Sequence, residues 1–324
     1  MAYVLLYLLE GSISAAQISE QMPERDIRSI QRALVRLTEL ALVTRKGVNN
    51  PTYSLNYDTL VGLDIPPRLL ELEDRPISHL HHGFMKWLEG LSPAEIDQLF
   101  GNQDDKIPLA RIHTPMSAKE LEYLTVELSW KSAALEGNTY TLLDTQLLLT
   151  EGVKAKNKTD FETQMILNHK NAINFMTDHN ELFSDNTIGF RTVEELHKII
   201  GYNLGIESGV RKKIVKITSS NYQPLDNPYQ LRESMDVVLA VISRATNPFA
   251  KALLALTLVP YLQVFEDGNK RTGRLLANGL LMSTIGRGFS LRKVTAKELA
   301  LAYLCFYEFN SVASLKRLLL AELT

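Results

Sequence analysis

A short polar loop between two apolar segments carries the residues whose types and spacing favour chemistry. Residues 253–262 and 274–282 have apolar side chains at helical spacing, and residues 265–274 between them combine glycine, carboxylates and cations. A loop that opens a helix points unpaired backbone N–H groups outward at the positive end of the helix dipole. Phosphates bind at such ends, so this pattern predicts an anion site.

Each residue type in the loop suits a phosphate ligand. Gly268 lacks the Cβ that would block close approach. Asp267 can hold Mg²⁺, which usually sits between one or two carboxylates and the phosphates of a substrate. Arg271 and Arg274 are three residues apart, so they share a helix face and can grip phosphate oxygens as forks. The predicted phosphate-binding residues are Gly268, Asn269, Lys270, Arg271 and Arg274.

The run from Gln263 to Arg274 resembles the signature of the Fic (Fido) family of nucleotide-dependent protein modifiers, His-x-Phe-x-(Asp/Glu)-Gly-Asn-(Gly/Lys)-Arg-x-x-Arg. The resemblance implies a site for ATP and Mg²⁺ from which AMP passes to protein hydroxyl groups. In the family the first residue is the general base, but here it is Gln263, and Val264 replaces a frequent proline. A glutamine amide does not titrate near neutral pH, so we expect AMP transfer to be weak or lost.

Three functions remain open from the sequence. The protein could bind ATP and Mg²⁺ as a sensor or scaffold with little transfer. It could be an active protein adenylyltransferase in which Asp267, Glu266 or solvent takes the proton. It could also be chiefly a transcriptional regulator that senses the nucleotide. General-base catalysis contributes about 10²–10⁴-fold, and no histidine follows His197 in the chain. A histidine that the fold brings to the loop stays open as another base. The first function is therefore favoured.

A second segment, residues 132–138, resembles the family's inhibitory motif, (Ser/Thr)-x-x-x-Glu-(Gly/Asn). Residues 129–135 have helical character, and Gly137 is expected to end that helix. A carboxylate at the C-terminal end opposes the helix dipole, so Glu136 needs a partner. The resemblance implies that this partner is Arg274, in competition with the nucleotide. The predicted inhibitory residues are Ser132, Glu136, Gly137 and Asn138.

The resemblance covers about residues 117–320 and implies an all-helical core with a small β-hairpin flap over residues 209–224. In the family, the flap docks a protein target by adding a strand. The β-branched run at residues 213–217 and the turn signal at residues 219–221 fit such a hairpin.

Residues 1–56 carry the pattern of a winged helix-turn-helix domain: three helices, the first over residues 2–9, followed by a strand, a turn and a strand. A capping box at Ser14 and Gln17 opens the second helix, and apolar spacing marks the third over residues 27–40. Cations on the third helix and the wing make DNA a candidate partner, and a protein–protein module with a solvated arginine face is the alternative. The predicted DNA contacts are Arg28, Gln31, Arg32, Arg36 and Lys46.

The whole chain is expected to be mainly α, with residues 57–116 as a helical linker region and residues 117–324 as the Fic domain. The formal net charge of −2 excludes a globally basic nucleic-acid binder but not a local basic face. The single cysteine, Cys305, permits no intramolecular disulfide and favours the reducing cytoplasm. No apolar run reaches transmembrane length, so we expect no membrane contact, while a homodimer stays open.

Overall fold

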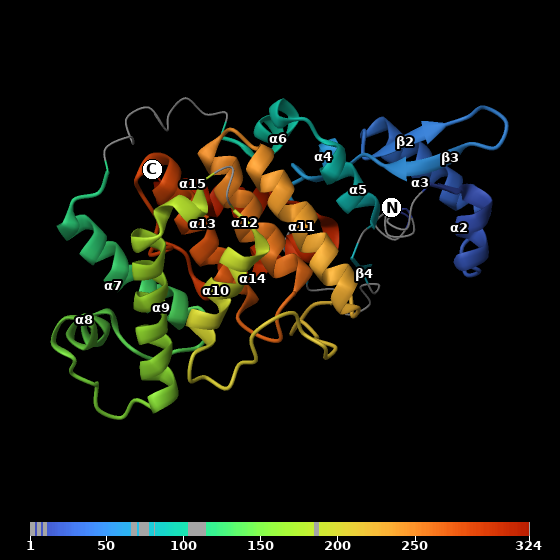
Figure 1. Cartoon of the computed structure of the whole chain (residues 1–324). Coiled ribbons are helices and arrows are strands. Elements are labelled where there is room, and N and C mark those ends of the chain that lie inside the picture. Colours follow the sequence, from blue (N-terminus) through green and yellow to red (C-terminus); the bar gives the residue numbers. More distant parts are fainter. Residues whose placement is uncertain are drawn as a thin grey trace. The chain divides into compact units, whose positions relative to one another are not determined.

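The computed structural model describes residues 4, 8, 12–65, 70, 78–80, 82–102, 115–184 and 188–323. Over these residues the protein is mainly helical, as predicted (Figure 1). The chain divides into two compact units. The first contains residues 1–91, 216–223 and 304–314, and the second contains residues 92–215, 224–303 and 315–324. The predicted helix over residues 2–9 lies largely outside the described residues.

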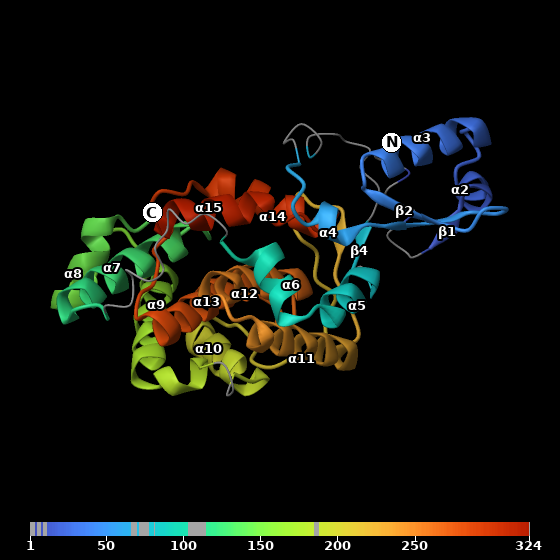
Figure 2. The ribbon, with the colours of Figure 1, turned by 90° about the horizontal axis from the view of Figure 1, so that it is seen from above.

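The N-terminal part of the first unit is a small antiparallel sheet packed against two helices (Figure 2). Strands β1 (Ile13–Ser14), β2 (Val43–Lys46) and β3 (Thr52–Leu55) are ordered β1-β3-β2. Helices α2 (Ala15–Gln21) and α3 (Ile27–Glu39) join β1 to β2 along the chain. The predicted second and third helices and the strand–turn–strand are therefore confirmed, and β1 is an addition to the prediction.

Local sequence explains where these two helices begin. Ser14 and Gln17 form the predicted capping box at the start of α2, and the Asp26 side chain accepts the backbone N–H of Ser29 at the start of α3. Helix α3 buries Ile30 and Leu34 in the apolar cluster that it shares with the sheet. Its other face is consequently free to carry charge.

The first unit also contains α4 (Tyr57–Leu60), α5 (His82–Gly90) and two short parallel strands, β4 (Ser78–His79) and β5 (Tyr222–Gln223). The predicted hairpin over residues 209–224 is not formed: β5 is the only strand among these residues, all of which are described. The turn signal instead binds Glu308, which accepts hydrogen bonds from Ser220 Oγ (2.9 Å) and Asn221 N (3.1 Å). These contacts hold the turn against a helix, so it does not return a second strand.

The second unit is helical. At its centre, α12 (Pro248–Leu262) is buried on all sides, as its continuous apolar sequence requires, and it packs against α13 (Asn269–Ile285). A Cβ at Gly273 of α13 would approach Pro260 Cδ to 3.0 Å, so glycine permits this close packing. The surrounding helices are α6 (Pro93–Phe100), α7 (Ala118–Ala134), α8 (Leu142–Glu151), α9 (Asp160–Asp178), η4 (Asn180–Phe183), α10 (Phe190–Gly201) and α11 (Pro228–Arg244). Helices α14 (Ala296–Phe309) and α15 (Ala313–Leu323) contribute residues to both units.

Three further predictions can be compared with these helices. The helix expected at residues 129–135 is the end of the longer α7, and Gly137 follows it with φ 91°. The segments expected before and after the anion loop lie in α12 and α13, but α13 begins earlier, at Asn269. In the part of the chain that the structure describes, no helix is both long and apolar enough to span a membrane.

Candidate functional site

The loop between α12 and α13 is shaped by two left-handed residues and one side-chain amide. Gln263 ends α12 with φ 50° and ψ 50°, and Gly268 precedes α13 with φ 81°. Between them, the Asn269 amide donates to Phe265 O (2.8 Å) and accepts from Phe265 N (3.0 Å). No side chain caps the start of α13, so the backbone N–H groups of its first turn have no intrahelical acceptor. The residues predicted to bind an anion thus lie at the start of a helix whose first N–H groups have no intrahelical acceptor.

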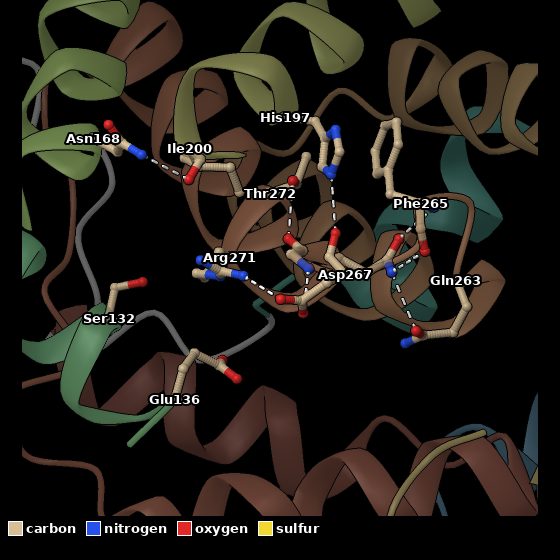
Figure 3. Close-up of polar contacts among 12 residues, drawn as sticks. Ser132, Glu136, Asn168, His197, Ile200, Gln263, Phe265, Asp267, Arg271 and Thr272 are labelled. Carbon is tan, nitrogen blue, oxygen red and sulfur yellow. Dashed lines mark hydrogen bonds and ion pairs between the residues drawn. The ribbon is translucent and has the colours of Figure 1, made fainter. Parts of the chain in front are cut away.

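The side chain of Gln263 is held inside this loop (Figure 3). Its Nε2 donates to Pro260 O (2.7 Å), and its Oε1 accepts from Asn269 Nδ2 (3.1 Å). Its main-chain oxygen accepts a hydrogen bond from Arg211 Nε (2.6 Å). The amide thus bridges the end of α12 to the start of α13 and places no titratable group at this position.

The fold brings His197 of α10 to the loop, which its sequence position alone does not reveal (Figure 3). Its ring stacks on Phe265 with centroids 3.7 Å apart, and its Nε2 donates to Asp267 O (2.9 Å). Burial lowers the pKa of His197 to about 4, so the ring is neutral at pH 7. The basic nitrogen is then Nδ1, which is buried without a hydrogen-bond partner among the described residues. His197 therefore supports the loop and cannot take a proton from a hydroxyl group in solvent.

The acidic and basic side chains of the loop are partly paired. Asp267 Oδ1 accepts from Gly268 N (2.6 Å), and its Oδ2 lies 2.8 Å from Arg271 Nη2. The Asp267 side chain is 66% exposed, whereas that of Arg271 is 3% exposed. The second terminal nitrogen of Arg271, Nη1, is buried and has no hydrogen-bond partner among the described residues. Glu266 pairs with Lys213 Nζ (2.9 Å).

Arg274 is fully buried and reaches the segment that the sequence singles out as inhibitory. Its Nη2 lies 2.7 Å from Glu136 Oε1 and donates to Ser132 O (3.1 Å), while its Nε donates to Ser132 Oγ (3.0 Å). Burial opposes ionisation of Glu136, but the positive charges of Arg274, Lys270 and Arg271 outweigh it and lower the pKa of that carboxyl. The two predicted partners are therefore in ion-pair contact as charged groups.

The rest of the 132–138 segment is anchored to α9. The Asn138 amide donates to Glu162 O (2.8 Å) and accepts from Tyr140 N (3.0 Å). The Glu162 carboxylate in turn accepts hydrogen bonds from the backbone N–H groups of Thr139 and Thr159 (both 3.0 Å). This anchoring fixes the chain that follows Glu136.

A divalent cation at this site would depend on a bound nucleotide. Among the described residues, no three potential metal-ligating side chains gather at one point. The Asp267 carboxylate is exposed to solvent. Mg²⁺ usually combines one or two carboxylates with phosphate oxygens and water. Asp267 therefore fits a Mg²⁺ ion that arrives with ATP.

The predicted DNA contacts gather on the exposed face of α3 and on the strand after it. A shallow groove is lined by Arg28, Gln31, Arg32, Val35, Arg36 and Glu39. Arg36 Nη1 pairs with Glu39 Oε2 (3.0 Å), which neutralises part of the face. Lys46 is exposed on β2. The three arginines thus share one surface of the first unit.

Comparison with known proteins finds similarity to the same family as the signature at residues 263–274. Residues 187–281 match the model of the Fic/DOC family. The protein adenylyltransferase Fic of Nematostella vectensis is 25% identical over 189 residues, which are 57% of this chain and 42% of that protein. The protein adenylyltransferase fic-1 of Caenorhabditis elegans is 25% identical over 163 residues, 47% of this chain and 31% of that protein. The matched region is thus less than half of each relative.

Two solved structures share the fold. A Fic-1 fragment from C. elegans superposes with a TM-score of 0.51 and 20% identity, covering 74% of this chain and 70% of that one. A Fic-domain signaling protein from Bacteroides thetaiotaomicron gives a TM-score of 0.53 and 17% identity, covering 68% of this chain and 95% of that one. The range that matches the Fic/DOC family model, residues 187–281, contains α10–α12, the loop and most of α13.

Proposed function

We propose that this protein binds ATP with Mg²⁺ at the loop between α12 and α13 and transfers AMP to protein hydroxyl groups weakly or not at all. One observation supports the proposal: the start of α13 has no side-chain cap, while the side chain at the base position is an amide that is hydrogen-bonded to Pro260 and Asn269. Binding and proton transfer are therefore separable here.

Three groups support the binding of phosphate. The uncapped N-terminus of α13 offers backbone donors, and Arg271 Nη1 lacks a partner among the described residues. Lys270 adds a third positive group at the same helix end. Asp267 would hold Mg²⁺ bridged to the phosphates, and the metal would neutralise charge on them. The ligand class that satisfies all of these groups is a nucleoside triphosphate.

An active adenylyltransferase is the second reading of the same site, and the names of the curated relatives favour it. This activity needs another base, and both side chains proposed for that role from the sequence are paired with cations. Asp267 pairs with Arg271 (2.8 Å), and Glu266 pairs with Lys213 (2.9 Å). Each carboxylate thus already has an oxygen in contact with a cation, so that oxygen is not open to a target hydroxyl group in this arrangement. Weak transfer is consequently the better expectation.

Glu136 is proposed to restrain nucleotide binding. Its carboxylate is paired with Arg274, which would otherwise be available as a charged donor to a terminal phosphate.

A protein target is proposed to lie along residues 209–224. Within the second unit, Arg211 N donates to Val264 O (2.9 Å), so the start of that segment is tied to the loop, and Ile214 is exposed beyond it.

Titration calorimetry with ATP and Mg²⁺ tests the binding proposal. Glu136→Ala removes the charge-assisted hydrogen bond to Arg274. Its affinity for ATP is therefore expected to be higher than that of the wild type by on the order of tenfold. Glu127→Ala is the matched control, because Glu127 lies on α7, is similarly half-buried and pairs with Arg292 away from the loop. Adding Arg271→Ala to Glu136→Ala should weaken binding again. Absence of binding by folded Glu136→Ala at millimolar ATP would overturn the proposal.

A second candidate function is DNA binding by the first unit, and the groove on α3 favours it. Exposed arginines along one helix face can pair with phosphates on either side of a DNA groove. We expect binding to duplex DNA to weaken as salt rises, with a slope of about −0.9 per phosphate contacted. The double variant Arg28→Ala/Arg32→Ala should reduce that slope, whereas Arg292→Ala in the second unit should not. If the wild type, Arg28→Ala/Arg32→Ala and Arg292→Ala bind DNA equally, a protein partner for this face is favoured instead.

A further inference from the structure

We propose that His169 is a positioning residue for the nucleotide site: it orients the Ser132 hydroxyl so that Ser132 holds Arg274 in the inhibitory contact with Glu136. This inference rests on the proposed binding of ATP at this site. It adds a second restraint on Arg274, one buried behind the partly exposed carboxylate of Glu136.

A chain of hydrogen bonds assigns the role. His169 Nδ1 lies 2.8 Å from Met165 O, and His169 Nε2 lies 2.9 Å from Ser132 Oγ. A carbonyl oxygen only accepts, so Nδ1 carries the proton and, in a neutral ring, Nε2 is an acceptor. The Ser132 hydroxyl must then donate to Nε2. Its lone pairs are left for Arg274 Nε, which donates to the same oxygen at 3.0 Å.

The surroundings hold this chain in one arrangement. The side chains of His169, Ser132 and Arg274 are all fully buried, so water does not offer the hydroxyl another acceptor. Electrostatics also keep the ring neutral. Burial, and then the positive charges of Arg271 and Arg274, lower the pKa of His169 to about 3. A proton on Nε2 would turn that nitrogen into a donor and remove the acceptor that Ser132 uses.

Loss of the His169 acceptor should release Arg274. A serine in a helix can donate to the carbonyl oxygen one turn earlier, and for Ser132 that is Leu128 O in α7. The hydroxyl would then turn away from Arg274 Nε. Arg274 would keep Glu136 and Ser132 O as partners, but its side chain would be less restrained and more available to a phosphate.

Substitutions at His169 and Ser132 separate positioning from simple core packing. His169→Leu removes both ring nitrogens, whereas His169→Gln places an amide near the position of Nε2 and keeps an acceptor for Ser132. Ser132→Ala removes the hydroxyl itself. Ser129→Ala is the matched control, because Ser129 is equally buried on the same helix and its Oγ has no hydrogen-bond partner among the described residues.

Calorimetric titration of these variants of the whole 324-residue chain with ATP and Mg²⁺, below their measured melting temperatures, gives the test. His169→Leu and Ser132→Ala should each bind ATP several-fold more tightly than the wild type, and together no more tightly than either alone, because both break one chain. His169→Gln and Ser129→Ala should bind like the wild type.

Two outcomes would overturn the inference: folded His169→Leu binding ATP like the wild type, or His169→Gln and His169→Leu behaving alike. Glu136→Ala keeps these outcomes distinct from failure of the proposed function. If Glu136→Ala binds ATP and His169→Leu matches the wild type, only the role of His169 is wrong. If no variant binds ATP, including Glu136→Ala, the site itself has been misassigned.

Discussion

Gln263 shows how one residue can keep a loop intact while changing its chemistry. Its amide supplies one donor to Pro260 O and one acceptor to Asn269. Few side chains other than an amide or a neutral imidazole can do both. The residue therefore preserves the bridge from α12 to α13, and what it gives up is the ability to exchange a proton near neutral pH.

At the residue scale, Asp267→Asn should make ATP binding insensitive to Mg²⁺. In the wild type, Mg²⁺ should strengthen ATP binding, because the exposed carboxylate can share the ion with the phosphates. An asparagine removes that charge and also frees Arg271 from its ion pair, so metal-free ATP should bind at least as well as to the wild type. Calorimetry with Mg²⁺ and with EDTA measures both affinities.

Glu266→Gln is the control for that experiment, since Glu266 is the adjacent carboxylate and is paired with Lys213. It should keep the wild-type response to Mg²⁺. If Asp267→Asn retains the full Mg²⁺ effect and Glu266→Gln loses it, the metal has been assigned to the wrong carboxylate.

At the scale of elements, the inhibitory segment is stabilised by the start of α9. Glu162 closes the capping box of α9 with Thr159 and also binds Thr139, so it joins two chain segments. Hydrogen bonds from Thr139, then from Thr159, lower the pKa of Glu162 to about 2. The carboxylate is consequently ionised in the folded protein well below the usual range.

The sign of the resulting pH effect follows from linkage. A carboxyl whose pKa is lower in the folded state contributes stability above its unfolded pKa, and that contribution is lost as pH falls through the folded pKa. For Glu162 the window runs from about 4.5 down to about 2. Denaturant unfolding at several pH values should therefore show a smaller gap between wild type and Glu162→Gln at pH 2 than at pH 5. A gap that does not change with pH would contradict this assignment.

The sequence predicts elements well where the signal is local. One capping box, apolar spacing and Gly137 place α2, α3 and the end of α7, and the signature residues place the loop. It does not predict β1, a two-residue strand defined by its pairing with β3. It also suggests a hairpin at residues 209–224, because β-branched residues and a turn signal say nothing about Glu308, the residue that captures the turn.

The same limit applies to the site. Glu136 and Arg274 could be paired from the resemblance, and the structure brings them together. His169 and His197 could not be assigned from their positions in the sequence, since each reaches the site only through the packing of α9 and α10. A buried histidine becomes informative only when the atoms around its two nitrogens are known.

At the scale of the whole molecule, each unit is built from segments distant in sequence. The first unit takes residues 216–223 and 304–314 in addition to the N-terminal residues, and Glu308 and β5 account for how these pieces join. The domain boundaries expected after residues 56 and 116 remain predictions. A net charge of −2 is compatible with the cationic face of α3 because the charge on that face is local.

The measurement that tests the central claim most directly is transfer of label from α-³²P-ATP with Mg²⁺ to protein, because the claim is that the site binds ATP but lacks a base. A neutral imidazole has one donor and one acceptor nitrogen, so histidine at position 263 can keep one loop contact and still accept a proton. We predict little labelling by the wild type or Glu136→Ala, and labelling higher by on the order of 10²-fold in Glu136→Ala/Gln263→His. Adding Arg271→Ala to that double variant should abolish it. Efficient labelling of a protein by the wild type would contradict the claim that the base is missing.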